Sequence, residues 1–439
     1  MLRDIIEEIE TKDIASWYGA RVDDTKRLLE KHAPVLRFED GEKFFPMSAL
    51  LYLVCSTIWH IPVKPRADWG GPRSFDLLRT SPHIQLEIDL QLESMRQYRS
   101  KGDVHPGIEE CVDLVEVEER FANSPGGYPD QVRESVKQVV QTKLDRLHII
   151  DNFVLEEEEQ GLLALHFADS IRGWWLWSPR LWLPKDTEQK AKEKYDILTR
   201  EGKDVYYYGR VVDQCGYRIL QYWFFYAFNN WRSSLPVLDK LVPGLNKHEG
   251  DWECVFIYGK PEGDHGFTPT HTAYSAHHNS GKRVQRPWKH VETFEKNHPV
   301  VYVGRGSHAN FYTSGSHGFD SAQGNDREIG PGDWGEIRLL IDDEPWDEPD
   351  WLFFEGFWGA QIRDPTTMQN APLGPHYTAG PGKYRPRLRP KWWAPTQWAE
   401  LPCLLGPKCE HPTHGWAEYR WGEWEDYWSE DEDWYGPEG

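Results

Sequence analysis

The segment 219–226 constrains the fold more than any other stretch, because it reads ILQYWFFY and carries no charge. Aromatic and β-branched residues favour extended strands. A run this apolar predicts a central strand that is buried on both faces. A turn signal, DQCG at 213–216, separates it from a second expected strand at 206–212. Further short strands separated by turns favour an antiparallel β-sandwich over a parallel sheet with crossover helices.

Changes in composition and in the spacing of apolar residues divide the 439-residue chain into four expected regions. Apolar residues at helical spacing predict helix within 2–32, and similar patterns recur at 84–99 and 130–150. The apolar stretch 47–63 contains His60 and Pro62, so we expect a buried helix there and not a membrane span. The predicted fold class is α+β, mainly β. Its expected parts are a helical segment with the first core strand at 1–63, a mostly helical insertion at 64–204, the antiparallel β-sandwich core at 205–390, and a Trp-rich acidic tail at 391–439.

Composition narrows the range of partners. The net charge is −21, from 71 acidic and 50 basic residues, which disfavours nucleic acid and anionic lipid as sustained partners. The chain also has 23 Trp, 20 Tyr and 18 Phe, enough to build a β-rich core from aromatic rings. Six scattered cysteines indicate a reducing compartment, and the first residues lack an apolar signal core. We therefore expect a soluble, cytoplasmic protein without a transmembrane span.

The motif NKHEGDWEC at 246–254 is the strongest candidate for a site. Asp251 and Glu253 are two residues apart in an expected strand, so both carboxylates point to the same face. His248 precedes Gly250, where a turn can bring the imidazole over that face. Two carboxylates and one imidazole predict a divalent-cation site, and oxygen-rich ligand sets favour Mg²⁺, Ca²⁺ or Mn²⁺. The alternative is a solvated strand face with an ordinary turn histidine.

Six blocks of sequence resemble the vacuolar-protein-sorting-associated protein 62 family. They occur in the order found in that family and span roughly residues 31–390, interrupted by the insertion. The blocks are APVLRFEDGEKFFP at 33–46, LQYWFFYAFN at 220–229, HEGDWE at 248–253, YSAHH at 274–278, HPVVYVGRGSHANFY at 298–312 and WLFFEGFWG at 351–359. This resemblance implies a shared fold and site more than a particular reaction.

HEGDWE is also similar, more remotely, to the GHRHDWE signature of the necrosis- and ethylene-inducing-peptide-like cytolysins. The resemblance assigns His248, Asp251 and Glu253 to cation ligands on a β-sandwich that recognises a membrane glycolipid. It implies an upstream aspartate as the fourth ligand, and Asp239 is the nearest acidic residue. The second histidine of the signature is Gly250 here, so its role is absent, and the missing secretion signal argues against a cytolysin.

Other polar residues are secondary candidates. His277 and His278 cannot both face the same way on a strand, and one of them fits a role in binding substrate or supporting the site. Arg305, Ser307 and His308 follow an expected strand end among glycines, where loops often carry function. A last set has the ligand types of a structural zinc site, although its spacing matches no standard finger: Cys403, Cys409, His411 and His414.

Two functions from different classes therefore remain open. One is a cation-dependent binding protein that recognises a glycan, a lipid head group or another small ligand, in peripheral contact with a membrane where the ligand is a lipid. The other is a metal-dependent hydrolase, in which the cation activates water and a histidine moves protons.

Overall fold

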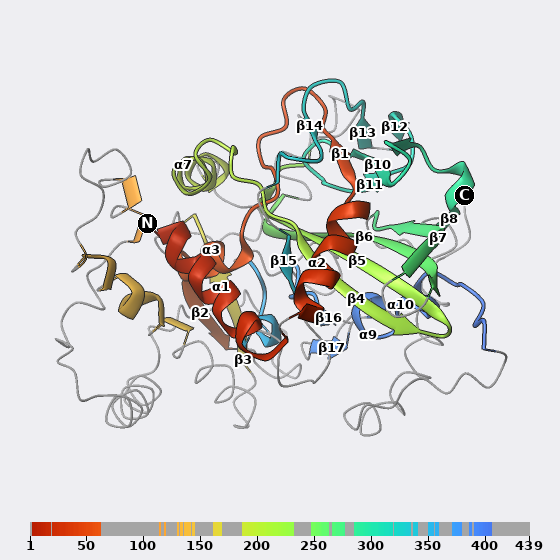
Figure 1. Ribbon diagram of the computed structural model, residues 1–439. Helices are drawn as coiled ribbons and strands as arrows, with labels where there is room; N and C mark the ends of the chain where they lie inside the picture. Colours follow the sequence, from red (N-terminus) through yellow and green to blue (C-terminus); the bar gives the residue numbers. More distant parts are fainter. Residues whose placement is uncertain are drawn as a thin grey trace, which may run out of the picture.

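The computed structural model describes about half of the chain in long stretches. These are residues 2–62, helical residues between 114 and 144, and 161–168, 187–231, 247–262, 266–276, 285–340, 350–359, 371–379 and 386–405, with single residues and short gaps omitted. The described chain is mixed α and β with mostly sheet, as predicted (Figure 1).

A six-stranded sheet contains the predicted central strand. Its order is β15-β4-β5-β6-β7-β8, and every neighbouring pair is antiparallel except β15 with β4. The long apolar segment forms β5, and the candidate motif forms the start of β6, so both lie in the middle of the sheet. The strand bounds are β4 Tyr208–Gln214, β5 Tyr217–Asn229, β6 His248–Glu262, β7 Gly266–Tyr274, β8 Gln285–Pro287 and β15 Arg338–Leu339.

A five-stranded sheet includes the first core strand that was expected within 1–63. Its order is β11-β10-β1-β14, with β9 also paired to β10. Its β1 runs parallel to β10, unlike the antiparallel pairing that was expected. The strand bounds are β1 Val35–Arg37, β9 Thr293–Phe294, β10 His298–Val303, β11 Asn310–Phe311 and β14 Glu328–Ile329. Three two-stranded ribbons complete the described sheets: β2 Thr57–Pro62 with β3 Gly161–His166, β12 Gly315–His317 with β13 Asp320–Ala322, and β16 Tyr377–Ala379 with β17 Pro386–Leu388.

The six-stranded sheet is buried on both faces. One face presents side chains such as Leu220, Phe224 and Ile257 to Leu36 and Val301 of the five-stranded sheet. The opposite face carries Trp223, Phe225, Trp252 and Cys254 and packs against helices and Trp358. Figure 1 places the two sheets next to each other. The helices α9 Pro390–Trp393 and α10 Pro395–Trp398 contribute Trp392 and Trp398 to the cluster on the opposite face. Burial on both faces explains why β5 is so uniformly apolar.

The predicted N-terminal helix is present as two helices, α1 Leu2–Tyr18 and α2 Ala20–His32. The helix predicted over 47–63 is wrong beyond residue 54. The helix α3 spans Ala49–Val54, and the hydroxyl of Ser48, just before it, accepts the Leu51 N–H. After Val54 the chain turns into the strand β2. Periodicity missed this change because β2 is stabilised by pairing with β3, about 100 residues later in the sequence.

The described parts of the expected insertion contribute to the core. They comprise helical residues between 114 and 144, the strand β3 and α7 Thr187–Thr199, whereas the pattern at 84–99 lies outside the described residues. Leu165, Phe167 and Tyr195 belong to the hydrophobic cluster that covers one face of the six-stranded sheet. Among the described helices, none has the length and apolar character needed to cross a bilayer.

Because of the buried His32 at the end of α2, we expect the folded protein to lose stability in acid. Burial lowers the pKa of its imidazole to about 4, although a hydrogen bond to the Asn297 carbonyl opposes the shift. The unfolded chain binds this proton below about pH 6.5, and the folded chain only near pH 4. Its contribution is therefore present above about pH 6.5 and is lost as the pH falls to about 4, a loss of roughly 2–3 kcal/mol.

The neutral variant His32→Gln isolates this contribution. Urea unfolding across that pH range should show a steeper decline for the parent than for His32→Gln. Parallel declines in the two proteins would show that His32 does not couple folding to protons.

Candidate functional site

The candidate site lies at the start of β6, where the alternation of the strand separates polar from aromatic side chains. Asp251 pairs with Tyr226 of β5, and Glu253 pairs with Phe224. Tyr226, Phe224 and Val255 all belong to the cluster shared with the five-stranded sheet, whereas Trp252 and Cys254 belong to the opposite cluster. Asp251 and Glu253 therefore share one face, with Trp252 and Cys254 on the other, as period-two alternation predicted.

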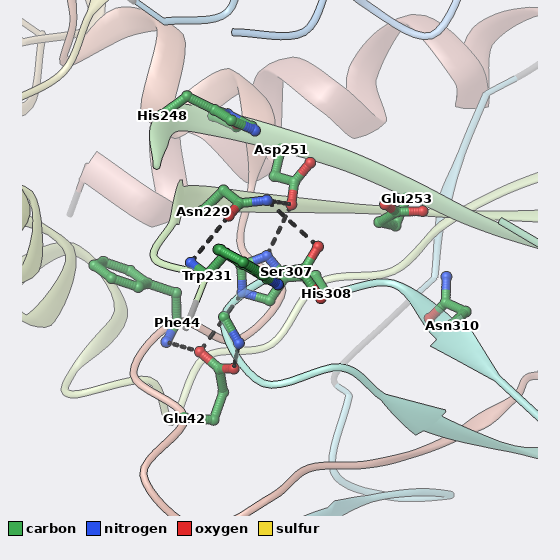
Figure 2. A network of polar contacts seen from close by, with 12 residues as sticks. Glu42, Phe44, Asn229, Trp231, His248, Asp251, Glu253, Ser307, His308 and Asn310 are labelled. Atoms are coloured by element: carbon green, nitrogen blue, oxygen red, sulfur yellow. Dashed lines mark hydrogen bonds and ion pairs between the residues drawn. The ribbon is translucent and has the colours of Figure 1, made fainter. Parts of the chain in front are cut away.

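Asp251 is buried and held by two donors, as Figure 2 shows. The amide of Asn229 donates to Asp251 Oδ2 at 3.0 Å, and His308 Nδ1 donates to the same oxygen at 2.9 Å. The other ring nitrogen of His308 lies 3.5 Å from Glu42 Oε1. His308 thus lies between two buried carboxylates that come from distant parts of the sequence.

His308 is a buried imidazolium at neutral pH. Burial disfavours its charge, but Glu42 and Asp251 outweigh burial and raise the pKa of His308 to about 9. In turn, burial opposes ionisation of Glu42, yet His308 and backbone N–H groups hold the pKa of Glu42 below its usual value. The ring of Tyr226 stacks on that of His308, with 3.8 Å between the centroids. Packing and charge together keep His308 in a left-handed backbone conformation, with φ of 55°, that costs a non-glycine residue energy.

Glu42 joins two loops below the imidazole. Its carboxylate accepts the backbone N–H of Gly306 at 2.7 Å and that of Phe44 at 3.0 Å. A second carboxylate, Glu188 of α7, binds the side chains of Lys43 and Lys247 at 2.6 and 2.7 Å. Lys43 directly follows Glu42, and Lys247 directly precedes His248. Through these two ion pairs, α7 holds the chain on both sides of the site.

Glu253 belongs to a neighbouring polar cluster. The hydroxyl of Ser275, at the end of β7, donates to Glu253, and the amide of Asn310 donates to Ser275 Oγ at 3.2 Å. Three buried oxygen atoms in this region have no partner within the described part of the chain: Tyr226 OH, Ser307 Oγ and Asn310 Oδ1. Buried polar atoms without a protein partner are unusual and often mark the place of a water or an ion.

The predicted cation ligands are only partly assembled. His248 is half-buried at the start of β6 (Figure 2). Its Nδ1 donates to the Gly250 carbonyl at 2.8 Å. Within the described residues, no three His, Cys, Asp or Glu side chains form a group that could hold a metal ion. Asp239, His277 and His278 lie outside the described residues. The described residues alone therefore do not fit a complete metal site.

The remaining predicted residues have different surroundings. Arg305 Nη1 lies 3.2 Å from Glu39 Oε1, whereas the Ser307 carbonyl accepts the Asn229 amide at 3.4 Å. Cys403 lies beside Cys215, while the other expected zinc ligands, Cys409, His411 and His414, fall outside the described residues.

Sequence reasoning missed Glu42, Asn229, Tyr226 and Asn310. All four lie within the sequence blocks that carry the family resemblance, which was the only available signal.

Gly250 has a packing reason to be glycine. Its φ is 63°, and a Cβ added there would lie 1.9 Å from the Trp358 carbonyl oxygen. A histidine, which the cytolysin signature has at this position, therefore does not fit. On the same side of β6, the buried carboxylate of Glu249 accepts from His166 Nδ1 at 2.8 Å and from the Ala168 N–H at 2.7 Å.

Comparison with known proteins adds no family assignment. No family model matches the chain, and no curated protein or solved structure is significantly similar to it.

Proposed function

We propose that the protein binds a divalent cation at the Asp251–Glu253 face and, through the cation, recognises a glycan or lipid head group. We also propose that the two facing sheets form a β-sandwich of the kind that the resemblance to the vacuolar-protein-sorting-associated protein 62 family implies. Under this proposal Asp251 and Glu253 supply carboxylate oxygens. The remaining ligands come from His248, from the ligand itself or from residues outside the described chain, such as Asp239.

An excess of buried carboxyl groups carries the proposal. Glu42 and Asp251 both contact the imidazolium of His308, and the buried Glu253 lies in the neighbouring polar cluster. Burial raises the pKa of the Tyr226 hydroxyl, and Tyr207 and then the charges of all three carboxyl groups raise it further. Buried carboxylates are costly, and Glu42 and Asp251 share only the single positive charge of His308, so a divalent cation at this face would balance their remaining charge.

The chemistry of the surrounding atoms supports a hard cation. Tyr226, Ser307 and Asn310 place unpartnered oxygen atoms near the carboxylates, and oxygen ligands suit Mg²⁺, Ca²⁺ and Mn²⁺. The hydrolase alternative gains less support. With its pKa raised to about 9, His308 is protonated at neutral pH and is a poor general base. His308 is therefore unsuited to that role, and the two other histidines considered for it, His277 and His278, lie outside the described residues. We favour binding because the cytolysins that the motif resembles recognise a glycolipid.

Thermal melts of the EDTA-treated protein, with and without each of the three ions, test the proposal. We expect one ion to raise the melting midpoint of the parent, since a ligand that binds only the folded state stabilises it. Asp251→Asn should abolish that rise, because it removes a carboxylate that the cation would bind. The matched control Asp213→Asn alters an exposed aspartate of β4 and should keep the full response.

Calorimetric titration of the same proteins measures the stoichiometry, which should be about one ion per chain. A parent whose midpoint ignores all three ions and that releases no heat on titration would refute cation binding. An Asp251→Asn protein that responds like the parent would place the cation elsewhere.

A further inference from the structure

Cys215 and Cys403 are brought together from positions 188 residues apart in the sequence. The Cys403 thiol donates to the Cys215 carbonyl oxygen, with 3.7 Å between sulfur and oxygen. The next residue, Leu404, donates its backbone N–H to the same oxygen at 3.0 Å. Neither of these two cysteines is in a disulfide, and Cys215 is buried whereas Cys403 is half-buried.

The backbone hydrogen bond limits how far apart the two cysteines are. Standard bond lengths put the Cα atoms of Cys215 and Cys403 at most about 8 Å apart across this hydrogen bond. Disulfides usually join Cα atoms separated by about 4.4–6.8 Å. The pair therefore needs at most a small backbone shift to form a disulfide.

The conformation of Cys215 is a second, independent observation. It occupies, with Gly216, the two-residue turn between β4 and β5, where φ is 54° at Cys215 and 81° at Gly216. Positive φ at both central residues marks a type I′ turn, for which asparagine followed by glycine is favoured. A cysteine in the first position is therefore a strained choice, and it stands at the residue whose carbonyl oxygen contacts the Cys403 thiol.

We propose that Cys215 and Cys403 form a disulfide in response to peroxide. The disulfide fastens the segment after α10 to the β4–β5 turn. The more accessible Cys403 thiolate attacks a peroxide oxygen and becomes a sulfenic acid, with release of water or an alcohol. The Cys215 thiol then attacks the Cys403 sulfur, the S–S bond forms, and a second molecule, water, leaves. Two thiols lose two electrons and two protons, and the peroxide is reduced.

The consequence is a change in how firmly the chain after α10 is held. In the reduced protein, the contacts near Cys215 include the Leu404 hydrogen bond and the packing of Leu404 and Leu405 against Gly216. Both leucines are exposed, at 46% and 74%. A covalent link across 188 residues restricts the unfolded chain strongly and stabilises the fold.

Peptide mapping of the full-length protein after hydrogen peroxide and alkylation tests the proposal. We expect a Cys215–Cys403 cross-linked peptide in the parent and in the control Cys409→Ser, and its absence in Cys403→Ser and Cys215→Asn. Asparagine suits the turn, so Cys215→Asn folds without the thiol. The oxidised parent should melt several degrees higher than the reduced parent, and dithiothreitol should reverse the shift.

Two results would overturn the proposal. One is a map in which both cysteines stay fully alkylated after peroxide, or in which Cys403 pairs with Cys409. The other is an oxidised parent that contains the cross-link but melts no higher than the reduced parent. That result would show that the disulfide does not stabilise the attachment of the segment after α10.

Discussion

Gly250→Ala should destabilise the protein by on the order of 4 kcal/mol, one of the largest effects expected of a single methyl group. An added Cβ would lie 1.9 Å from the Trp358 carbonyl oxygen and 3.0 Å from its carbonyl carbon. Trp358 cannot withdraw easily, because its carbonyl also accepts the Tyr52 hydroxyl at 2.9 Å and its indole is fully buried. The cost therefore combines a clash of backbone atoms with the penalty for φ of 63°.

Gly318→Ala separates these two causes. Gly318 has nearly the same φ, 62°, but a Cβ there would have nothing within 4 Å. This control should lose only about 1 kcal/mol, the conformational penalty alone. Chemical denaturation of the two variants measures the difference. Equal losses in both would show that the contact between β6 and Trp358 does not determine the choice of glycine.

Local patterns in the sequence predicted the parts of the fold that depend on neighbouring residues. The apolar run at 219–226 identified a central strand, and the spacing of Asp251, Trp252 and Glu253 identified which side chains share a face. Both follow from the geometry of a single strand. Helix within 2–32 was likewise visible in its periodicity, although its division into α1 and α2 was not. The failure at 57–62 has the opposite cause, because β2 depends on pairing with β3.

The site was predictable only to the extent that one strand carries it. Asp251 and Glu253 were found because they lie two residues apart in one motif. Glu42 and Asn229 were not singled out, since only folding brings them to His308 and Asp251. The sequence showed three candidate ligands but not the buried imidazolium that already neutralises one of them. Nothing local to His308 indicates a pKa near 9, because the charges that raise it are remote in the sequence.

His308→Asn should cost about 3–5 kcal/mol of stability, because it leaves Glu42 and Asp251 buried without their shared counter-charge. Asparagine tolerates the left-handed conformation at this position, so the loss reports on the charge and the ring more than on the backbone. Denaturation of His308→Asn, Asp251→Asn and the double variant, all treated with EDTA, measures the coupling. The double variant should lose less than the sum of the single losses, because only one carboxylate then remains unpaired. Additive losses would show that the two residues do not act as a pair.

The pH dependence of the same variants provides a separate measurement. The pKa of His308 is about 9 in the folded protein, above the value of about 6.5 for an unfolded chain. Its contribution to stability is therefore complete below about pH 6.5 and is lost as the pH rises through about 9. The stability of the EDTA-treated parent should decline across that interval, while that of His308→Asn should change little. Tyr226, which stacks on the ring, stays neutral in this range because burial raises the pKa of its hydroxyl well above 10. A parent whose stability is constant from neutral to alkaline pH would show that His308 is not held as a cation between Glu42 and Asp251.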